Sequence, residues 1–401
     1  MATTLHEIDV IRSTRAFLQR FGLQGRPVLD VYTDAHPTLL ADTALRPFQR
    51  FTLSFDGFAV HPDLVGRLAD GETTFAVEAK GTRDLITGIA QAEIYRNGFH
   101  VVLLASAGIP SRDLLTLARQ RDVGVLAVFP DRIDVIDLPP THLPQLRHAE
   151  SIRKQFGTTD VLSRQFVFNL PTHYLCLAPV LREWYIHSGS ILADIAALER
   201  FTRHHYPELP KGETSFRAVV SGAEKLGIVR VQGSQVQPTY VGTAVADLLP
   251  DAASLADIHR QIKPGRQTLA TVCPTAGAVL RCLLYSDPVA KFIIDVLRDI
   301  GVAEPVSLRS LVLHSAERDK ILTASIFFTP ESAGTVTDDQ GQLAWHRIQP
   351  RHFRSTLFYQ YKSILKHAGV LAPHRLGTPS AAHYDPDADI WELAGSAAFR
   401  M

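Results

Sequence analysis

The spacing of apolar side chains divides this chain into two parts of different texture. Residues 6–21 carry apolar side chains at helical spacing, such as Val10, Ile11 and Leu18, which predicts an amphipathic helix. Apolar runs and helical stretches then alternate as far as Pro139-Pro140. We expect strands at residues 28–32, 51–60, 100–105, 123–129 and 132–138, and helices at residues 84–97 and 111–122. This alternation predicts an α/β domain over residues 1–140.

Helices dominate the rest of the chain. Helical patterns precede and follow a tight hairpin around Gly233-Ser234, an order that indicates a winged helix-turn-helix of α+β type. These elements are expected at residues 191–205, 214–226, 228–232, 235–240 and 242–249. A second such unit is expected at residues 289–300, 307–313 and 353–367, with a long wing at 374–384 and 389–393. Because Lys263-Pro264-Gly265 makes a natural linker, we expect domains at residues 141–265 and 266–401.

Composition narrows the classes of protein that fit. The 401 residues contain 41 Lys plus Arg and 41 Asp plus Glu, which argues against a uniformly basic nucleic-acid coat. The three widely spaced cysteines make neither a disulfide framework nor a zinc site. The start has no secretory pattern, and apolar runs stay far below the 18 residues of a membrane span. We therefore expect a cytoplasmic protein with no membrane partner.

Residues 61–81, HPDLVGRLADGETTFAVEAKG, form the segment in which chemistry is expected. Asp70-Gly71 is a turn signal. If this turn is the centre of a hairpin, two residues whose numbers sum to 141 lie opposite each other on its two strands. Asp63 and Glu78 satisfy this sum, so their Cβ atoms are expected about 4.5–5.5 Å apart. Lys80 lies two residues beyond Glu78 and projects from the same face.

Two carboxylates this close repel each other unless a cation neutralises them. Carboxylate oxygens are ligands that Mg²⁺ takes, and the backbone carbonyl of Ala79 is a third candidate ligand. The Lys80 ammonium would then lie beside the water that the metal binds, where it can orient the nucleophile and offset charge on a phosphate. The sequence therefore predicts a Mg²⁺ site in which Mn²⁺ can substitute.

This arrangement resembles the PD-(D/E)xK nuclease superfamily over residues 5–140. Asp63, Glu78 and Lys80 match its three signature positions, and Pro62 matches the proline before the aspartate. Gln91 and Tyr95 match the QxxxY motif of the RecB-like and Cas4-like branches. The resemblance implies a restriction-endonuclease-like α/β fold and phosphodiester hydrolysis that leaves a 5′-phosphate. It also implies catalytic roles for these five residues and a metal-ligand role for an acid on the first helix, for which Glu7 is the candidate.

Each of these assignments has an alternative. A solvated Glu–Lys strand edge with a chance aspartate would explain the motif without chemistry. Asp56 competes with Asp63 as the first carboxylate, although its spacing of 22 residues from Glu78 needs a longer hairpin. Glu7 could instead interact with the dipole of its helix. Gln91 and Tyr95 could simply pack a helix face onto the sheet.

The zero net charge conceals a segregated basic stretch. Residues 340–384 contain no aspartate or glutamate, and aromatic side chains are interspersed among the basic ones there. The candidates for nucleic-acid binding are Arg347, Arg351, Arg354, Lys362, Lys366 and Arg375. Within the helix at 353–367, Arg354, Gln360, Lys362 and Lys366 are expected to face outward, as in a recognition helix. The alternative is a solvated face on a packing domain.

These features together favour a Mg²⁺-dependent DNA endonuclease with winged-helix units that hold the duplex. A nuclease with DNA-reading units and no P-loop favours restriction or anti-phage defence, with a partner protein from such a system. A homodimer is expected because cutting two strands needs two sites related by a two-fold axis. The alternatives are a winged-helix DNA-binding regulator with an inactive nuclease fold, and a nuclease that acts on RNA.

Overall fold

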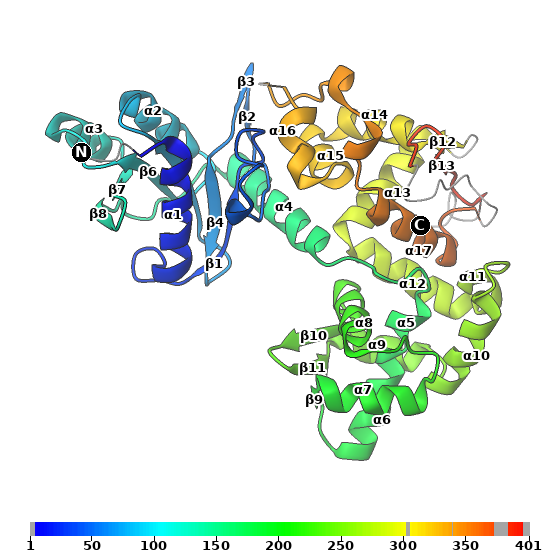
Figure 1. Ribbon diagram of the computed structural model, residues 1–401. Coiled ribbons are helices and arrows are strands. Elements are labelled where there is room, and N and C mark those ends of the chain that lie inside the picture. Colours follow the sequence, from blue (N-terminus) through cyan, green and yellow to red (C-terminus); the bar gives the residue numbers. More distant parts are fainter. Residues whose placement is uncertain (1–4, 302–304, 339, 373–383, 396–401) are drawn as a thin grey trace. The chain divides into compact units, whose positions relative to one another are not determined.

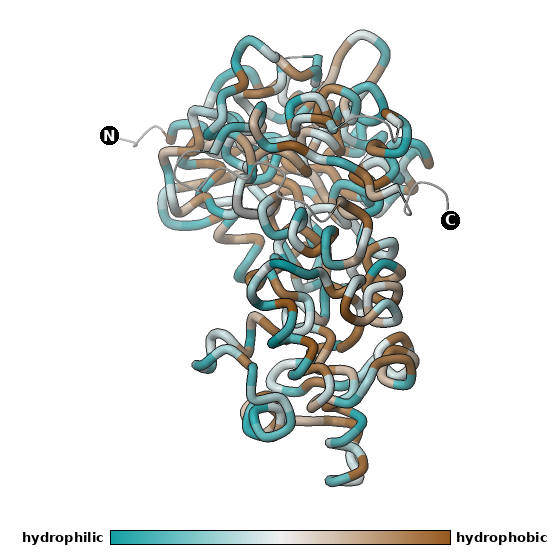
Figure 2. The backbone as a smooth tube through the Cα atoms, turned by 90° about the vertical axis from the view of Figure 1, so that its right-hand side faces the viewer, coloured by the Kyte–Doolittle hydropathy of each residue, from teal (hydrophilic) through white to brown (hydrophobic). Residues whose placement is uncertain are grey.

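The computed structural model describes residues 5–301, 305–338, 340–372 and 384–395 and divides the chain into two compact units. The first unit comprises residues 1–159 and 319–352, and the second comprises residues 160–318 and 353–401. Apolar and polar stretches alternate along the chain in both units (Figure 2). No helix in the described ranges combines the length and apolar character needed to cross a bilayer.

A six-stranded mixed sheet forms the centre of the first unit (Figure 1). In spatial order its strands are β1 (Val28–Thr33), β4 (Leu64–Leu68), β5 (Thr74–Lys80), β6 (Val101–Ala107), β7 (Gly124–Val128) and β8 (Ile133–Asp137). β5, β6 and β7 run parallel to one another, whereas β1, β4 and β8 pair antiparallel with their neighbours. β5 to β7 are buried along nearly their whole length, as the near-continuous apolar runs of parallel strands require.

Helices cover both faces of this sheet. On one face, Val10 and Leu18 of α1 (Glu7–Phe21) share a core with Phe75 and Val77 of β5. On the other face, α2 (Leu85–Tyr95) packs with Ala76 and its neighbours. α3 (Arg112–Gln120), with Ser111 as its N-cap, and the first part of α4 (Leu146–Ser163) extend that second layer. The α/β class expected for this part of the chain is confirmed.

The structure corrects the expectation of a single strand at residues 51–60. These residues form two short strands, β2 (Leu53–Phe55) and β3 (Phe58–Val60), which pair as a separate hairpin. Asp56-Gly57 makes the turn, where Gly57 adopts a φ of +90° that favours glycine. The apolar run hid this turn because it continues on both sides of it.

The second unit begins with a compact α+β arrangement. Its elements in chain order are α5 (Thr172–Leu175), α6 (Leu177–Ser188), β9 (Ala193–Asp194), α7 (Ile195–His205), α8 (Glu213–Lys225), β10 (Val229–Gln232), β11 (Gln235–Pro238) and α9 (Tyr240–Leu248). β10, β11 and β9 form a three-stranded antiparallel sheet. The expected hairpin is present, and the helix expected from residue 191 starts at Ile195, where the Asp194 side chain caps it.

Further helices complete the second unit. They are α10 (Ala252–Ile262), α11 (Leu269–Val272), α12 (Pro274–Ser286), α13 (Pro288–Ile300), α14 (Leu308–Arg318) and α17 (Ser355–His367). β12 (Val306–Ser307) pairs with β13 (Ile390–Trp391), which uses part of the sequence expected to form a second wing. Residues 374–383 of that predicted wing lie outside the described residues.

The two compact units differ from the three domains expected from the sequence. Residues 319–352 belong to the first unit, where they form α15 (Lys320–Phe327), α16 (Ala333–Val336) and the short 3₁₀ turns η2 (Pro330–Ser332), η3 (Trp345–Arg347) and η4 (Pro350–His352). Ala333 is buried in the same core as α1. No local sequence signal marks this return to the first unit, because it depends on long-range contacts with residues 1–159.

Candidate active site

The β4–β5 hairpin has the register expected from its turn. Leu64 pairs with Val77 and Arg67 with Thr74, so the residue numbers of each pair sum to 141, as expected. Asp63 directly precedes β4 and lies opposite Glu78 in this register. The Asp63 Oδ2 atom accepts a hydrogen bond of 2.7 Å from the backbone amide of Ala79, which fixes the first carboxylate beside the strand that carries Glu78 and Lys80.

Glu78 is buried, with 3% of its surface exposed, and both of its oxygens accept hydrogen bonds. Lys80 Nζ lies 2.6 Å from Oε1, and the Tyr95 hydroxyl donates to Oε2 at 2.6 Å. Tyr95 comes from α2, which covers this face of the sheet. The structure therefore brings together Glu78, Lys80 and Tyr95, as the two motifs predicted.

α2 approaches β5 closely at Gly88. A Cβ atom at this position would lie 2.9 Å from Lys80 Cγ and 2.8 Å from Leu104 Cδ1. Any larger residue would therefore press on the aliphatic stem of Lys80. The absence of a side chain at residue 88 helps to set the position of the lysine.

A third carboxylate lies beside Asp63 and was missed in the sequence. The β1–β4 ladder ends with Thr33 opposite Leu64, and the Asp34 amide continues it with a 2.9 Å bond to the Asp63 carbonyl. Because directly opposite residues of antiparallel strands project from the same face, Asp34, Asp63 and Glu78 form a row across β1, β4 and β5. The pairing of β1 with β4 spans a long connection, so no turn signal revealed it.

A cation stands at each end of this acidic row. Lys80 contacts Glu78 at one end. At the other end, Arg50 Nε donates to Asp34 Oδ1 at 2.9 Å, and an Nη atom donates to Asp34 Oδ2 at 2.8 Å. The two side chains of this pair are 9% and 7% exposed.

The row opens into a cavity of about 410 Å³. The titratable and amide side chains among its lining residues are Glu7, Asp34, His36, Arg50, His61, Asp63, Glu78, Lys80 and Gln91. Glu7 and Gln91 thus line the same cavity as the acidic row. The rival carboxylate, Asp56, is exposed in the β2–β3 turn and does not line the cavity.

Burial opposes a negative charge on two members of the row, Asp63 and Glu78. Burial, followed by the nearby charge of Glu78, raises the pKa of Asp63 well above its ordinary value. Burial also raises the pKa of Glu78, against the opposing effect of Lys80. For Lys80, burial lowers the pKa, but the carboxylates of Glu78 and Asp63 outweigh it and the net shift is upward. A further cation between the carboxylates of Asp63 and Glu78 would relieve their repulsion.

The oxygen donors here suit a hard divalent cation better than a soft one. The carboxylates of Asp63 and Glu78 are the side chains that would hold it, and the buried Gln91 Oε1 atom has no hydrogen-bond partner among the described residues. No group of three or more His, Cys, Asp or Glu side chains in the described ranges is placed to hold a metal ion. Metal ligation by Glu7 and by the carbonyl of Ala79 stays a prediction.

The outward orientation expected for Lys362 is wrong. Lys362 is 1% exposed, and its Nζ lies 2.6 Å from Asp389 Oδ1. Tyr361, Ile364 and Leu365 are buried too, so α17 is enclosed on more than its apolar face. Helical periodicity identifies an apolar face, but it cannot show that Lys362 is also covered, because its partner Asp389 lies 27 residues away in the sequence.

The other predicted basic residues do not all belong to one unit. Arg347 and Arg351 are exposed and lie in the first unit. Arg354 and Lys366 are half-buried and lie in the second, where burial lowers the pKa of Lys366. Arg375 lies outside the described residues. The acid-free stretch is therefore divided between two units, because the chain crosses from one to the other after His352.

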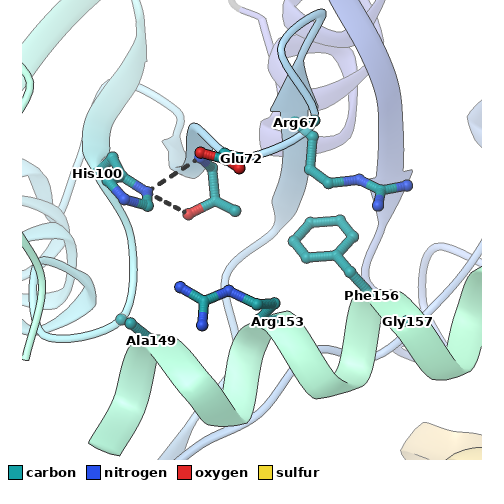
Figure 3. A pocket seen from close by; sticks show the side chains of 10 residues that line it. Arg67, Glu72, His100, Ala149, Arg153, Phe156 and Gly157 are labelled. Carbon is teal, nitrogen blue, oxygen red and sulfur yellow. Dashed lines mark hydrogen bonds between the residues drawn. The ribbon is translucent and has the colours of Figure 1, made fainter. Parts of the chain in front are cut away.

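A second cavity, of about 350 Å³, lies at the other end of β4 and β5 (Figure 3). Arg67 stacks over the ring of Phe156 and pairs with Asp30, and His100 Nδ1 lies 3.0 Å from Thr74 Oγ1. Glu72 is the one carboxylate among the described residues that line it. It lacks the paired carboxylates of the first cavity, so the first is the better candidate for hydrolytic chemistry.

No protein-family model, no curated protein and no solved structure matches this chain. The assignment of the site consequently depends on the geometry of the row and its two cations.

Proposed function

We propose that this protein is a divalent-metal-dependent nuclease that hydrolyses phosphodiester bonds of DNA at the Asp34–Asp63–Glu78 row. The observation that carries the proposal is the placement of Asp63, Glu78 and Lys80 together in one cavity, with Asp63 fixed to the amide of Ala79. Gln91 and Tyr95, the two residues of the helical motif, reach the same place from α2. A solvated strand edge would leave Glu78 exposed, whereas it is buried.

The side chains have distinct roles in this proposal. Asp63 and Glu78 hold the cation, which when bound supplies Lewis-acid chemistry that polarises a phosphate oxygen and acidifies water. Lys80 orients the attacking water and offsets charge that develops on the phosphate. The Tyr95 hydroxyl, whose pKa burial and Glu78 raise well above its ordinary value, stays protonated and keeps donating to Glu78. Gln91 contributes a buried carbonyl oxygen that can accept from a water.

The second unit would hold the duplex. Its order of α6, β9, α7, α8 and the β10–β11 hairpin supports a winged helix-turn-helix. Arg217 on α8 and Arg230 on β10 are exposed and available for phosphates, although Arg217 also pairs with Glu213 at 3.0 Å. A cytoplasmic restriction or anti-phage defence enzyme, acting as a homodimer, is the setting that we propose for such an architecture.

Cleavage of labelled plasmid and of single- and double-stranded DNA and RNA in Mg²⁺ or Mn²⁺ tests the function. We expect the wild type to cut DNA, and Asp63→Ala and Lys80→Ala to lose at least a hundredfold in rate, because each removes a group that acts on the transition state. Asp56→Ala is the matched control, since it removes an exposed aspartate of the adjacent hairpin that does not line the cavity. Equal cleavage by wild type and Asp63→Ala would contradict the proposal.

A second candidate function is DNA binding without hydrolysis. The observation that favours it is that Lys80 and Tyr95 already occupy both oxygens of Glu78, while the described residues hold no three-residue metal group. A binding protein would retard DNA in a gel shift but leave every substrate intact across the metals tested. Cleavage of RNA alone would instead reassign the substrate.

A further inference from the structure

Arg50 is placed unlike an ordinary structural arginine. It is the one arginine among the described residues that line the cavity, and it stands at the end of the acidic row opposite Lys80. Its position is fixed from several sides. The Gln49 amide bonds the Thr33 carbonyl at 2.9 Å, and a Cβ atom at Gly334 of α16 would lie 3.1 Å from an Arg50 Nη atom.

The guanidinium has more donors than its partner uses. Arginine carries five N–H donors in a planar fork, and the bonds to Asp34 occupy one on Nε and one on an Nη atom. No other hydrogen bond from the Arg50 side chain is present within the part of the chain that the structure describes. A largely buried cation with donors to spare at a cavity wall is suited to a ligand that carries several acceptor oxygens on one centre.

We propose that Arg50 binds a phosphate of the nucleic-acid strand in this cavity and that Asp34 is a positioning residue that orients its guanidinium. The inference rests on the proposed function, because it takes the ligand of the cavity to be a polynucleotide. The placement of the two cations supports it. Three carboxylates in a row repel a polyanion, and Arg50 and Lys80 at the two ends supply the charge that a strand crossing the row requires.

The chain contains a matched control for the structural role of such a pair. Arg67 of β4 pairs with Asp30 of β1, and the two side chains are 13% and 18% exposed. This pair joins β1 and β4, two of the three strands that the acidic row spans, but its arginine lines the second cavity (Figure 3). A purely structural Arg–Asp pair should therefore respond to substitution in the same way at both places.

The experiment measures the Kd of a fluorescent DNA oligonucleotide by anisotropy in Ca²⁺, over a range of salt concentrations, with melting temperatures recorded for each variant. Arg50→Ala should weaken binding about tenfold to a hundredfold, the loss typical of a charge-assisted hydrogen bond. It should also reduce the slope of log Kd against log salt by about 0.7 to 0.9, the value for one phosphate contact. Arg67→Ala should change neither quantity.

The double variant Asp34→Ala/Arg50→Ala separates contact from net charge. It removes one charge of each sign, so a nonspecific effect of an uncompensated Asp34 would disappear and affinity would return. Under the proposal affinity stays low, because the phosphate has lost its arginine. Arg50→Lys should recover part of the binding, since it restores the charge but not the fork.

Failure of the inference differs from failure of the proposed function. Cleavage that depends on Asp63, together with wild-type affinity and salt slope in Arg50→Ala, would overturn the role of Arg50 and leave the nuclease in place. Restored affinity in the double variant would overturn it as well. Because the binding assay requires no turnover, a protein that never cleaves DNA would still report whether Arg50 contacts the strand.

Discussion

The carboxylate of Asp63 accepts a 2.7 Å hydrogen bond from the backbone amide of Ala79, although the side chain lies in a row with two other acids. This bond lowers the pKa of Asp63, whereas burial and the charge of Glu78 raise it, and the net shift is upward. In the proposed nuclease, this position would therefore sacrifice stability to place a carboxylate where metal binding needs one.

Asp63→Asn should accordingly stabilise the protein while it abolishes cleavage. The amide oxygen can still accept from Ala79, but it carries no charge next to Glu78. We expect the free energy of unfolding to rise by about 0.5–2 kcal/mol, the range typical of a single stabilising substitution. Chemical denaturation at neutral pH measures this change, with the exposed Asp56→Asn as the comparison. A loss of stability in Asp63→Asn would show that the carboxylate contributes to folding.

Divalent cations should stabilise the wild type against heat. A ligand that binds the folded state at a hundred times its Kd adds about 2.7 kcal/mol. The stabilisation by Mg²⁺ or Mn²⁺ should be much smaller in Asp63→Asn and unchanged in Asp56→Asn, because only the former loses a carboxylate of the cavity. Differential scanning fluorimetry over a metal titration provides the measurement, and equal shifts in all three proteins would place the metal elsewhere.

Local signals were sufficient for the hairpin that carries the candidate site. The turn at Asp70-Gly71 sets the register of β4 and β5, and the opposition of Asp63 and Glu78 follows from counting. Gln91 and Tyr95 followed from helical spacing in the same way.

The rest of the site depends on contacts between distant segments. Asp34 joins the row through the β1–β4 pairing, and Arg50 through an irregular segment whose Gln49 amide bonds the Thr33 carbonyl. Neither has a turn or a periodic pattern that fixes it. Lys362 was misplaced for the same reason, since its partner Asp389 lies beyond a stretch that no periodicity connects to α17.

Gly88→Val should reduce cleavage by displacing Lys80. The added side chain would begin 2.9 Å from Lys80 Cγ, so either the lysine stem or α2 must move. A shift of about 1 Å in a catalytic group costs on the order of a hundredfold in rate. Gly157→Val in α4 is the comparison, because a Cβ atom there meets nothing within 4 Å. Rate constants measured at saturating DNA test this, and full activity in Gly88→Val would mean that Lys80 needs no fixed position.

Lys362→Met should destabilise the second unit rather than act through a lost DNA contact. It leaves Asp389 buried without its ammonium partner, which typically costs about 3–5 kcal/mol. Lys362→Met/Asp389→Leu should recover most of that loss, since replacing both partners of a buried ion pair with apolar residues is often close to neutral. Urea denaturation of the two variants measures the difference. If Lys362→Met kept wild-type stability but bound DNA more weakly, Lys362 would belong to a DNA-binding surface after all.

The second unit should lose stability in mild acid because of His367. Its Nδ1 atom accepts a 3.1 Å hydrogen bond from the Leu269 amide, and burial, followed by the charge of Lys366, lowers its pKa to about 4. The unfolded chain, with a pKa near 6.5, therefore binds more protons than the folded one between these values. The contribution is fully present above pH 6.5 or so and declines as the pH falls toward about 4.

His367→Asn separates this titration from the other acid-sensitive groups. The asparagine Oδ1 atom can accept from Leu269 but takes up no proton in this range. The variant should lose less stability than the wild type between pH 7 and pH 4, by roughly 1–3 kcal/mol. His204→Asn, the same exchange at an exposed histidine of the same unit, is the matched control. Urea denaturation at several pH values tests the difference. Parallel curves for wild type and His367→Asn would contradict the prediction, because they would show that this imidazole takes up its proton equally in the folded and unfolded chains.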